Sequence, residues 1–292
     1  MNSLEPDHLR SRGAMTQRFS STHDAVPLTS RNSLLRLRGV SLSYPVDRRS
    51  QQTTEVLRNI DLEVRQRDFL CVIGSSGCGK TSLLRILAGY VQPTIGTVTL
   101  SGQPHTQPNA EVGVVFQQPN LFPWLTVEGN VEFGLKMKGM ARRDRQRQVE
   151  QYLELVELRD SAKLLPYQLS GGMKQRTAIA RALAANPKII LMDEPFAALD
   201  AMTRETMQLH LKKIWEQTHK SIFFITHDVE EALLLATRVM VMYPNPGRIV
   251  KEMVNPFAHE LGHYSTSQVR SSKAFVEMRE YLIAEIRGSH PY

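Results

Sequence analysis

The chain has 292 residues, 41% of them hydrophobic, which is enough for one large globular α/β unit with tails. Lysine and arginine number 36 against 29 aspartates and glutamates, and the net charge of +7 suits an anionic partner without choosing among nucleotide, nucleic acid and membrane surface. Two cysteines exclude a disulfide framework and favour a reducing compartment, and the most apolar run, residues 232–243, is shorter than the roughly 20 residues of a membrane span.

The first part of the chain, residues 1–33, is rich in Ser, Thr and Arg and lacks the apolar core of a secretory signal. Such a composition buries too little surface to offset the entropy of ordering. We expect a disordered leader here, or a start site placed too far upstream.

The first regular pattern begins at Leu35, where LRLRGVSLSY alternates polar and apolar residues up to Tyr44. VLRNIDLEV follows a polar stretch and predicts the second strand of an antiparallel hairpin. A buried strand, FLCVIG, then leads into the glycine-rich loop GSSGCGKT and a helix over residues 81–89. Strand, glycine loop and helix in this order predict a phosphate site.

Further strands are expected around residues 97–100 and 112–116. The sheet pattern then stops, and residues of about 118–168, with helical stretches such as 145–157, predict a helical subdomain inserted into the core. Strands at 188–192 and 221–225 with a helix at 203–217 between them predict a parallel βαβ unit. We therefore expect one core domain over 34–255 and a helical tail over 256–292.

The glycine loop supplies the first set of candidate site residues. Its glycines let consecutive N–H groups converge on a phosphate at a helix N-terminus, while Lys80 reaches the β- and γ-phosphates and the Thr81 hydroxyl reaches Mg²⁺. Cys78 is interpreted as a small loop filler, with oxidation sensitivity as the alternative. The candidate nucleotide ligands in this loop are Gly74, Ser75, Ser76, Gly77, Cys78, Gly79, Lys80 and Thr81.

Polar residues at other strand ends complete a candidate catalytic site. Asp193 ends an apolar strand, where a carboxylate needs a cation such as Mg²⁺, and Glu194 beside it is the candidate general base. His227 follows the strand 221–225 and is placed to contact a γ-phosphate. Gln117 likewise follows a strand and is a candidate for both metal and coupling contacts, with Gln118 as the competing choice.

A second anion site is predicted from LSGGMKQR, residues 169–176. A serine and two glycines open a helix there, so Ser170, Gly171 and Gly172 present free N–H groups to an anion. They cannot reach a phosphate already enclosed by the loop of their own chain, so an opposing copy of the chain is expected to supply it.

Together these motifs resemble the nucleotide-binding subunits of ATP-binding-cassette transporters over about residues 35–285. The resemblance implies an α/β P-loop cassette with a mainly parallel sheet core, an antiparallel β subdomain and an inserted helical subdomain, using ATP and Mg²⁺. It also implies that Tyr44 stacks on adenine, that Gln117 and Asp200 are the Q-loop and D-loop residues, and that His227 is the switch histidine. Two such subunits pair head to tail, with Ser170–Gly172 of one closing over the nucleotide of the other.

Within that family, LFPWLTVEGNV, PGRIV and the end SSKAFVEMREYLIAEI look like the importers of taurine first, other aliphatic sulfonates second and nitrate third. The resemblance implies transmembrane permease subunits as partners, with a solute-binding protein that acts on this chain only indirectly, and no nucleic-acid partner. It also implies a peripheral position on the cytoplasmic face of the cell membrane. A soluble cassette ATPase of DNA repair or translation is the alternative, although the paired cassettes or long coiled coil typical of that class are absent from the sequence. A P-loop kinase would leave LSGGMKQR unexplained.

Two surface features are also predicted. Leu121, Phe122, Trp124 and Leu125, set among prolines, are suited to grip a short helix of a membrane partner, the alternative being packing inside the helical subdomain. The basic stretch 136–147 is expected to be a solvated helix face rather than a lipid or nucleic-acid site.

Overall fold

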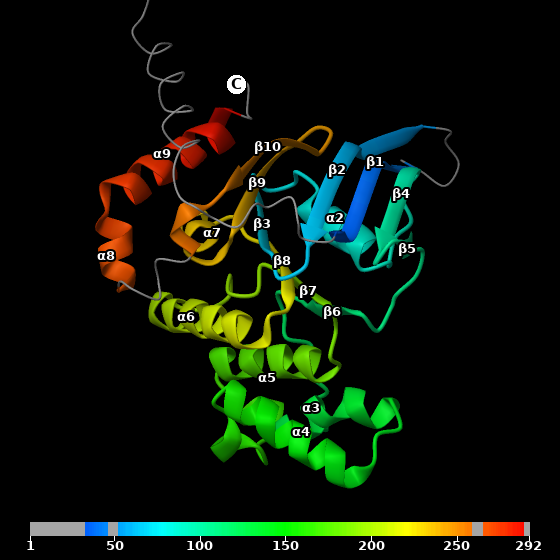
Figure 1. The fold of residues 1–292 in the computed structure, drawn as a ribbon, viewed down its shortest axis with the longest axis vertical. Coiled ribbons are helices and arrows are strands. Elements are labelled where there is room, and N and C mark those ends of the chain that lie inside the picture. Colours follow the sequence, from blue (N-terminus) through cyan, green and yellow to red (C-terminus); the bar gives the residue numbers. More distant parts are fainter. Residues whose placement is uncertain (1–32, 46–51, 259–264, 289–292) are drawn as a thin grey trace, which may run out of the picture. The chain divides into compact units, whose positions relative to one another are not determined.

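The computed structural model describes residues 33–45, 52–258 and 265–288. The predicted leader lies outside the described residues except for Ser33, which begins the first strand. Figure 1 shows two sheets with helices around them in the described part. No helix there is long and apolar enough to cross a membrane.

The first sheet is antiparallel and has the strand order β2-β1-β4-β5. Its long hairpin pairs β1 (Ser33–Pro45) with β2 (Thr53–Arg65), and β4 (Ile95–Leu100) lies on the other side of β1. A two-residue strand, β5 (Gln103–Pro104), closes the sheet. Leu35 and Leu37 of β1 are buried while Arg36 between them is partly exposed, the period of two that the sequence predicts.

The second sheet has six strands in the order β10-β9-β3-β8-β7-β6. All neighbours are parallel except the hairpin of β9 (Arg238–Tyr243) with β10 (Arg248–Val254). The remaining strands are β3 (Phe69–Gly74), β6 (Val112–Val115), β7 (Ile189–Asp193) and β8 (Ser221–Ile225). A mainly parallel core beside an antiparallel sheet confirms the predicted fold class.

Helices cover both faces of this sheet, and β3 separates two cores. Cys71 and Ile73 join the core formed with α3, α5, α6, α7 and α9, whereas Leu70 and Val72 face α2 and the antiparallel sheet. The helices of the core are α2 (Lys80–Leu87), α6 (Ala201–Thr218) and α7 (Val229–Leu235), followed by the tail helices α8 (Thr266–Ser271) and α9 (Lys273–Gly288).

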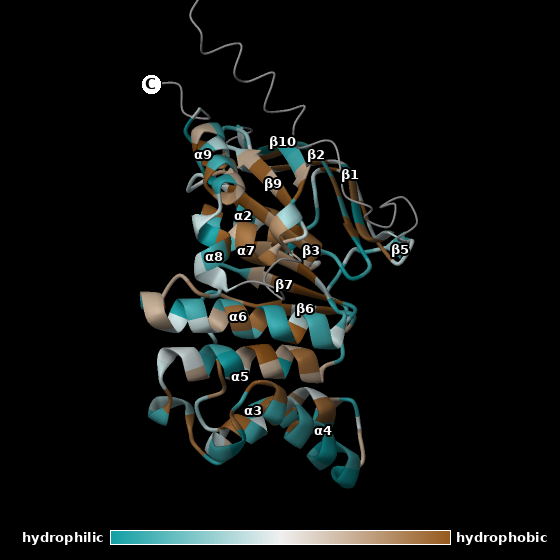
Figure 2. Cartoon of the chain, turned by 60° about the vertical axis from the view of Figure 1, so that its left-hand side comes forward, coloured by the Kyte–Doolittle hydropathy of each residue, from teal (hydrophilic) through white to brown (hydrophobic). Residues whose placement is uncertain are grey.

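Between β6 and β7 the chain forms α3 (Val127–Met137), α4 (Arg142–Leu155) and α5 (Gly171–Ala184), with short 3₁₀ turns at Arg159–Ser161 and Pro166–Gln168. These helices pack on one another, so the helical group extends past residue 168, where the sequence placed the end of the insertion. Figure 2 shows α4 as largely hydrophilic. The basic residues at its start, Arg142 and Arg143, are exposed, as expected of a solvated face. The domain boundaries themselves stay a prediction.

α7, β9 and β10 were not predicted from the sequence. Residues 232–243 are an apolar run too short for a membrane span, and the structure divides that run between the end of α7 and the whole of β9. Periodicity cannot separate a buried helix from a buried strand in a short run that is apolar throughout.

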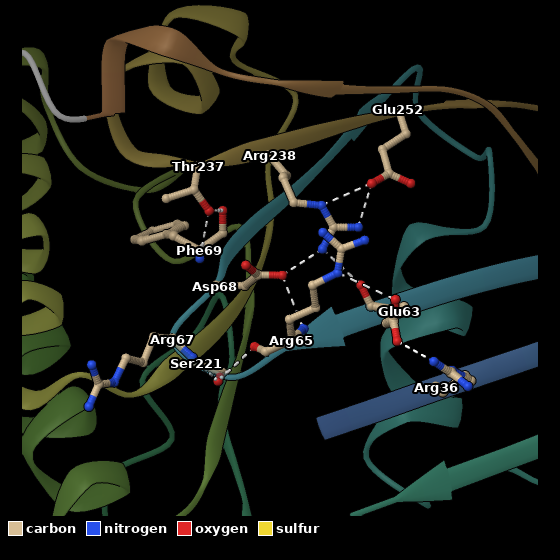
Figure 3. Close-up of polar contacts among 10 residues, drawn as sticks. All are labelled: Arg36, Glu63, Arg65, Arg67, Asp68, Phe69, Ser221, Thr237, Arg238 and Glu252. Carbon is tan, nitrogen blue, oxygen red and sulfur yellow. Dashed lines mark hydrogen bonds and ion pairs between the residues drawn. The ribbon is translucent and has the colours of Figure 1, made fainter. Parts of the chain in front are cut away.

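A buried arginine joins the start of β9 to its neighbours (Figure 3). The Arg238 side chain is 2% exposed and its Nη1 donates to Asp68 Oδ2 at 2.5 Å and to the Glu63 carbonyl at 3.0 Å. Its Nε donates to Glu252 Oε1 on β10 at 2.9 Å. The Asp68 side chain is 1% exposed, so this pair has lost its hydration and depends on its internal partners.

We expect Arg238→Met to lower the free energy of unfolding by about 3–5 kcal/mol, because it leaves a buried carboxylate without its cation. Urea denaturation at pH 7 measures this. Arg58→Met is the matched control, since Arg58 pairs with Glu55 at the surface and its loss should leave the midpoint unchanged. Equal midpoints for wild type and Arg238→Met would contradict the assignment of this pair as the tie between β9 and the β2–β3 turn.

Candidate nucleotide-binding site

The glycine loop connects the end of β3 to the start of α2. Gly77 and Gly79 have φ values of 78° and 95°, in the left-handed region that favours glycine. A Cβ on Gly74 would lie 2.3 Å from the Met242 carbonyl oxygen, so β9 leaves no room for a side chain there. The close turn therefore needs glycine at all three positions.

Lys80 lies back over this loop. Its side chain is buried, and Nζ donates to the carbonyl oxygens of Gly74 at 2.9 Å and Ser75 at 3.0 Å. The ammonium group is thus held at the loop, where a phosphate would replace weak carbonyl acceptors with a charged one. The Ser75 Oγ is buried and has no hydrogen-bond partner among the described residues, so it is free for a ligand.

Cys78 is 1% exposed in the same loop. Burial raises the pKa of its thiol, while the nearby Lys80 opposes that shift. A buried, protonated thiol reacts slowly, so the geometry favours loop filling over oxidation sensitivity.

Thr81 and Asp193 meet at the mouth of the loop. The Thr81 hydroxyl donates to Asp193 Oδ1 at 3.4 Å. Burial raises the pKa of Asp193, the Thr81 hydrogen bond opposes the shift, and the neighbouring Glu194 adds to it. A hydroxyl and a partly desolvated carboxylate are the oxygen ligands that Mg²⁺ takes, so these two residues fit the ion. No cluster of three or more His, Cys, Asp or Glu suited to a metal occurs in the described part.

Glu194 and His227 form a direct pair at the same sheet edge. His227 Nδ1 lies 3.0 Å from Glu194 Oε2, and the Glu194 N–H donates to the Ile225 carbonyl at 3.0 Å. Glu194 has a φ of 43°, a conformation held by that backbone bond to the end of β8. The exposed fraction of the His227 side chain is 63%, so the pair is open to a ligand.

Gln117 and Gln118 follow β6, and both side chains are exposed. Their segment is tied to α5 by residues that the sequence analysis did not single out. Gln175 Nε2 donates to the Phe116 carbonyl at 3.4 Å, and Arg181 donates to the carbonyls of Pro119 at 3.0 Å and Asn120 at 2.8 Å. Gln175 lies within LSGGMKQR, but its partner is distant in sequence, so no local pattern reveals the contact.

Ser170–Gly172 form the start of α5. Ser170 Oγ accepts a hydrogen bond from the Met173 N–H at 3.3 Å, and a Cβ on Gly172 would lie 2.8 Å from Thr203 Cγ2. Asp200 caps the adjoining α6 by accepting from the Thr203 N–H at 3.0 Å. A hydrogen bond from the Thr203 side chain, followed by the one from its N–H, lowers the pKa of the Asp200 carboxyl. No hydrogen bond or ion pair found in the described ranges joins Ser170–Gly172 to the glycine loop of the same chain.

Tyr44 lies near the end of β1, opposite Thr54, with 37% of its surface exposed. The chain after Pro45, residues 46–51, lies outside the described residues. Leu57 of β2 lies against the loop, since its Cδ2 lies 2.6 Å from a Cβ built on Gly79. The stacking role of Tyr44 therefore stays a prediction.

The comparisons with known proteins agree with this geometry. A family model described as ABC transporter matches residues 57–197. The taurine import ATP-binding protein TauB of Pseudomonas putida is 45% identical over 255 residues, which cover 87% of this chain and 95% of that protein. The chain belongs to the ABC transporter family.

A second sequence relative and a solved structure support the same family assignment. TauB of Rhizobium johnstonii is 46% identical over 239 residues, 82% of this chain and 91% of that protein. Among solved structures, the dimeric post-hydrolysis state of the ATP-binding cassette MJ0796 bound to ADP and Pi matches with a TM-score of 0.66 and 33% identity, covering 76% of this chain and 98% of that one. As an ABC cassette, this chain thus has the fold of a protein solved with nucleotide products bound.

One buried acid of the cassette lies four residues after His227 in the sequence. Glu231, on the first turn of α7, is 4% exposed and accepts a hydrogen bond from Gln208 Nε2 on α6 at 3.1 Å. Burial raises its pKa to about 7, against the opposing hydrogen bonds of Thr226 and Gln208. The folded chain therefore binds this proton more tightly than the unfolded chain does.

For such a group, the stabilising contribution is fully present below the unfolded pKa, about 4.5, and is lost as the pH rises through about 7. Glu231→Gln removes the cost of a buried charge, so the variant should match wild type near pH 4, below the unfolded pKa, and exceed it by on the order of 3 kcal/mol at pH 8. Urea denaturation across that range measures the difference. A difference that does not change with pH would show that Glu231 is ionised in the fold throughout.

Proposed function

We propose that this chain is the ATP-hydrolysing subunit of a membrane importer, and that the solute imported is taurine. The Glu194–His227 pair beside Thr81, Asp193 and the glycine loop carries the hydrolytic part of the proposal. Identity of 45% across nearly the whole length of taurine import ATP-binding proteins supports the solute. Other aliphatic sulfonates and nitrate are the alternatives for the same machine.

In the proposed reaction the loop N–H groups from Gly74 to Thr81 and the α2 N-terminus hold the β-phosphate, and Lys80 moves from its carbonyl acceptors to the γ-phosphate. Thr81 and Asp193 would hold Mg²⁺, which neutralises charge on the phosphates. Glu194 orients the attacking water and accepts its proton. His227 fixes Glu194 from Nδ1, and a simultaneous hydrogen bond from Nε2 to a phosphate oxygen requires a proton on both ring nitrogens.

A second copy of the chain completes the proposed site. Ser170–Gly172 open a helix of 14 residues, Gly171 is exposed, and no contact found among the described residues commits them to their own nucleotide loop. A helix N-terminus with exposed N–H groups suits the γ-phosphate of a facing copy. ATP then bridges two subunits, and hydrolysis removes the shared ligand, a two-state switch that the permease can read.

The proposed permease contact lies after Gln117. Trp124 is 72% exposed, and the ring of Phe122 packs 5.7 Å from Trp124 and 4.5 Å from Phe133 between centroids. Leu121, in contrast, packs against the main core. An anchored aromatic group with an exposed tip suits a short helix from a permease on the cytoplasmic face of the membrane.

The solute is tested by growth of a strain that lacks its own copy of the gene. Taurine or ethanesulfonate is the sole sulfur source, and in a parallel culture nitrate is the sole nitrogen source. Wild type should restore growth on taurine and Glu194→Gln should not, because the amide cannot accept the proton of water. The variant should still bind ATP, which is its control for folding. If wild type restored growth only on a different solute, that solute would replace taurine as the assigned substrate. If wild type and Glu194→Gln did not differ on any solute, the proposed importer function would be refuted.

Trp124→Ala should reduce taurine uptake by at least about ten-fold while the ATPase rate of the isolated subunit stays near wild type, because a well-packed aromatic anchor contributes about 2 kcal/mol or more to an interface. Uptake in cells and phosphate release by the purified chain are measured together. Tyr167→Ala, another exposed aromatic at 76%, is the control for loss of a surface ring. A parallel fall in uptake and ATPase rate would argue against a contact surface at Trp124.

A further inference from the structure

The C-terminal helices pack against the helix that follows the switch histidine. Phe275, Met278 and Leu282 of α9 are buried in the same core as Leu233 and Leu234 of α7. α7 and α9 are in contact, as are α6 and α7 (Figure 1). The tail is therefore part of the cassette core rather than an appendage.

Charged side chains at the rim of this packing link the tail to two other helices. Arg270 of α8 donates from Nη1 to Glu205 of α6 at 3.2 Å, and its Nε lies 3.5 Å from Glu230 Oε2 of α7. Arg279 of α9 donates to Glu230 Oε1 at 2.8 Å. Both oxygens of the Glu230 carboxylate thus face an arginine from the tail. These four side chains are 31–46% exposed, so their charges are only partly screened by solvent.

The two acids lie just beyond site residues in the sequence. Glu230 is three residues after His227, on the first turn of α7, and Glu205 follows the α6 cap Asp200 by five residues. We propose that Arg270 and Arg279 are positioning residues that fix α7 relative to α6 through Glu230 and Glu205, and thereby hold His227 against Glu194 for hydrolysis. This inference rests on the proposed ATPase function.

The position of His227 depends on the orientation of the short helix that follows it. α7 has only seven residues, and His227 lies in the loop directly before its cap, so a tilt of α7 moves the imidazole. The Glu194–His227 contact of 3.0 Å has little tolerance, because a shift of about 1 Å in a catalytic group costs up to 100-fold in rate. α7 is also held by apolar packing, by the Glu231–Gln208 bond and by Asn255, which donates to the carbonyls of Leu233 and Ala236 at its other end. Val229 and Glu231 in the first turn are buried, so Glu230 is the side chain there that pairs with the tail.

Steady-state ATP hydrolysis by the full chain tests this, with Arg270→Gln, Glu230→Gln and their double variant. Each single variant should lower kcat by about three- to ten-fold with KM for ATP within about two-fold of wild type, since the phosphate loop on β3 and α2 is not touched. The double variant should lose less than the product of the two single losses, because both changes break the Arg270–Glu230 contact, while Arg270→Gln also breaks the contact with Glu205 and Glu230→Gln the contact with Arg279. Arg270→Lys should recover part of the rate.

Lys273→Gln is the matched control. It removes one positive charge from the same tail, but the ion pair of Lys273 among the described residues is with Glu277 within α9, so the change should leave kcat unchanged. Thermal unfolding of every variant separates loss of rate from loss of fold. Wild-type rates in folded Arg270→Gln and Glu230→Gln, or an equal fall in Lys273→Gln, would overturn the inference. Absence of ATP hydrolysis by wild type itself would instead refute the proposed function.

Discussion

Parallel pairing of β7, β8 and β3 is the constraint on which the candidate site depends. Because these strands are adjacent and run the same way, their carboxyl ends meet at one edge, and each is followed there by polar residues. β3 leads to the glycine loop, β7 ends in Asp193 followed by Glu194, and β8 is followed by His227. The contacts Thr81–Asp193 and Glu194–His227 follow from this adjacency.

Charged side chains are paired within the chain at one edge of the parallel sheet and less completely paired at the other. At the amino-terminal edge, Arg238 is enclosed by Asp68 and Glu252, so its charge is balanced within the chain. At the carboxyl edge, burial raises the pKa of Asp193, and the hydrogen-bond acceptors of Lys80 Nζ among the described residues are two carbonyl oxygens and a thiol. The Arg238 ion pairs at the amino-terminal edge hold the strands in register. Asp193 and Lys80 at the carboxyl-terminal edge are the groups proposed to bind metal and phosphate.

Helix N-termini carry the links from the site to the rest of the molecule. α5 begins at the second glycine motif and ties its own later residues to the segment of Gln117. α6 begins at Asp200, and α7 begins just after His227. The tail helices contact the latter two through Arg270 and Arg279. In the proposed function, a change at the nucleotide would reach the helical group through α5 and the tail through α6 and α7.

The sequence alone predicted the elements whose residues follow a local rule. The glycine loop, the buried strand FLCVIG and the alternating hairpin from Leu35 are determined by neighbours a few residues apart, and the structure confirms them. It also placed Asp193, Glu194 and His227 at strand ends, and so at a common edge, without fixing their distances. The resemblance to a family supplied roles, such as those of Tyr44 and Asp200, that local chemistry does not dictate.

Tertiary structure decided what depends on partners distant in sequence. The hairpin of β9 and β10 is specified by pairing with β3, since its apolar run has no periodicity of its own. The bond between Glu194 and His227 spans 33 residues, and the tie of Arg181 to Pro119 spans 62. The ties of Arg270 and Arg279 to Glu230 likewise arise only when α8 and α9 fold back onto α7. Sequence pattern reports which side chains a segment buries, whereas the folded sheet decides which of them meet, because contact between distant segments depends on strand order and packing rather than on local preference.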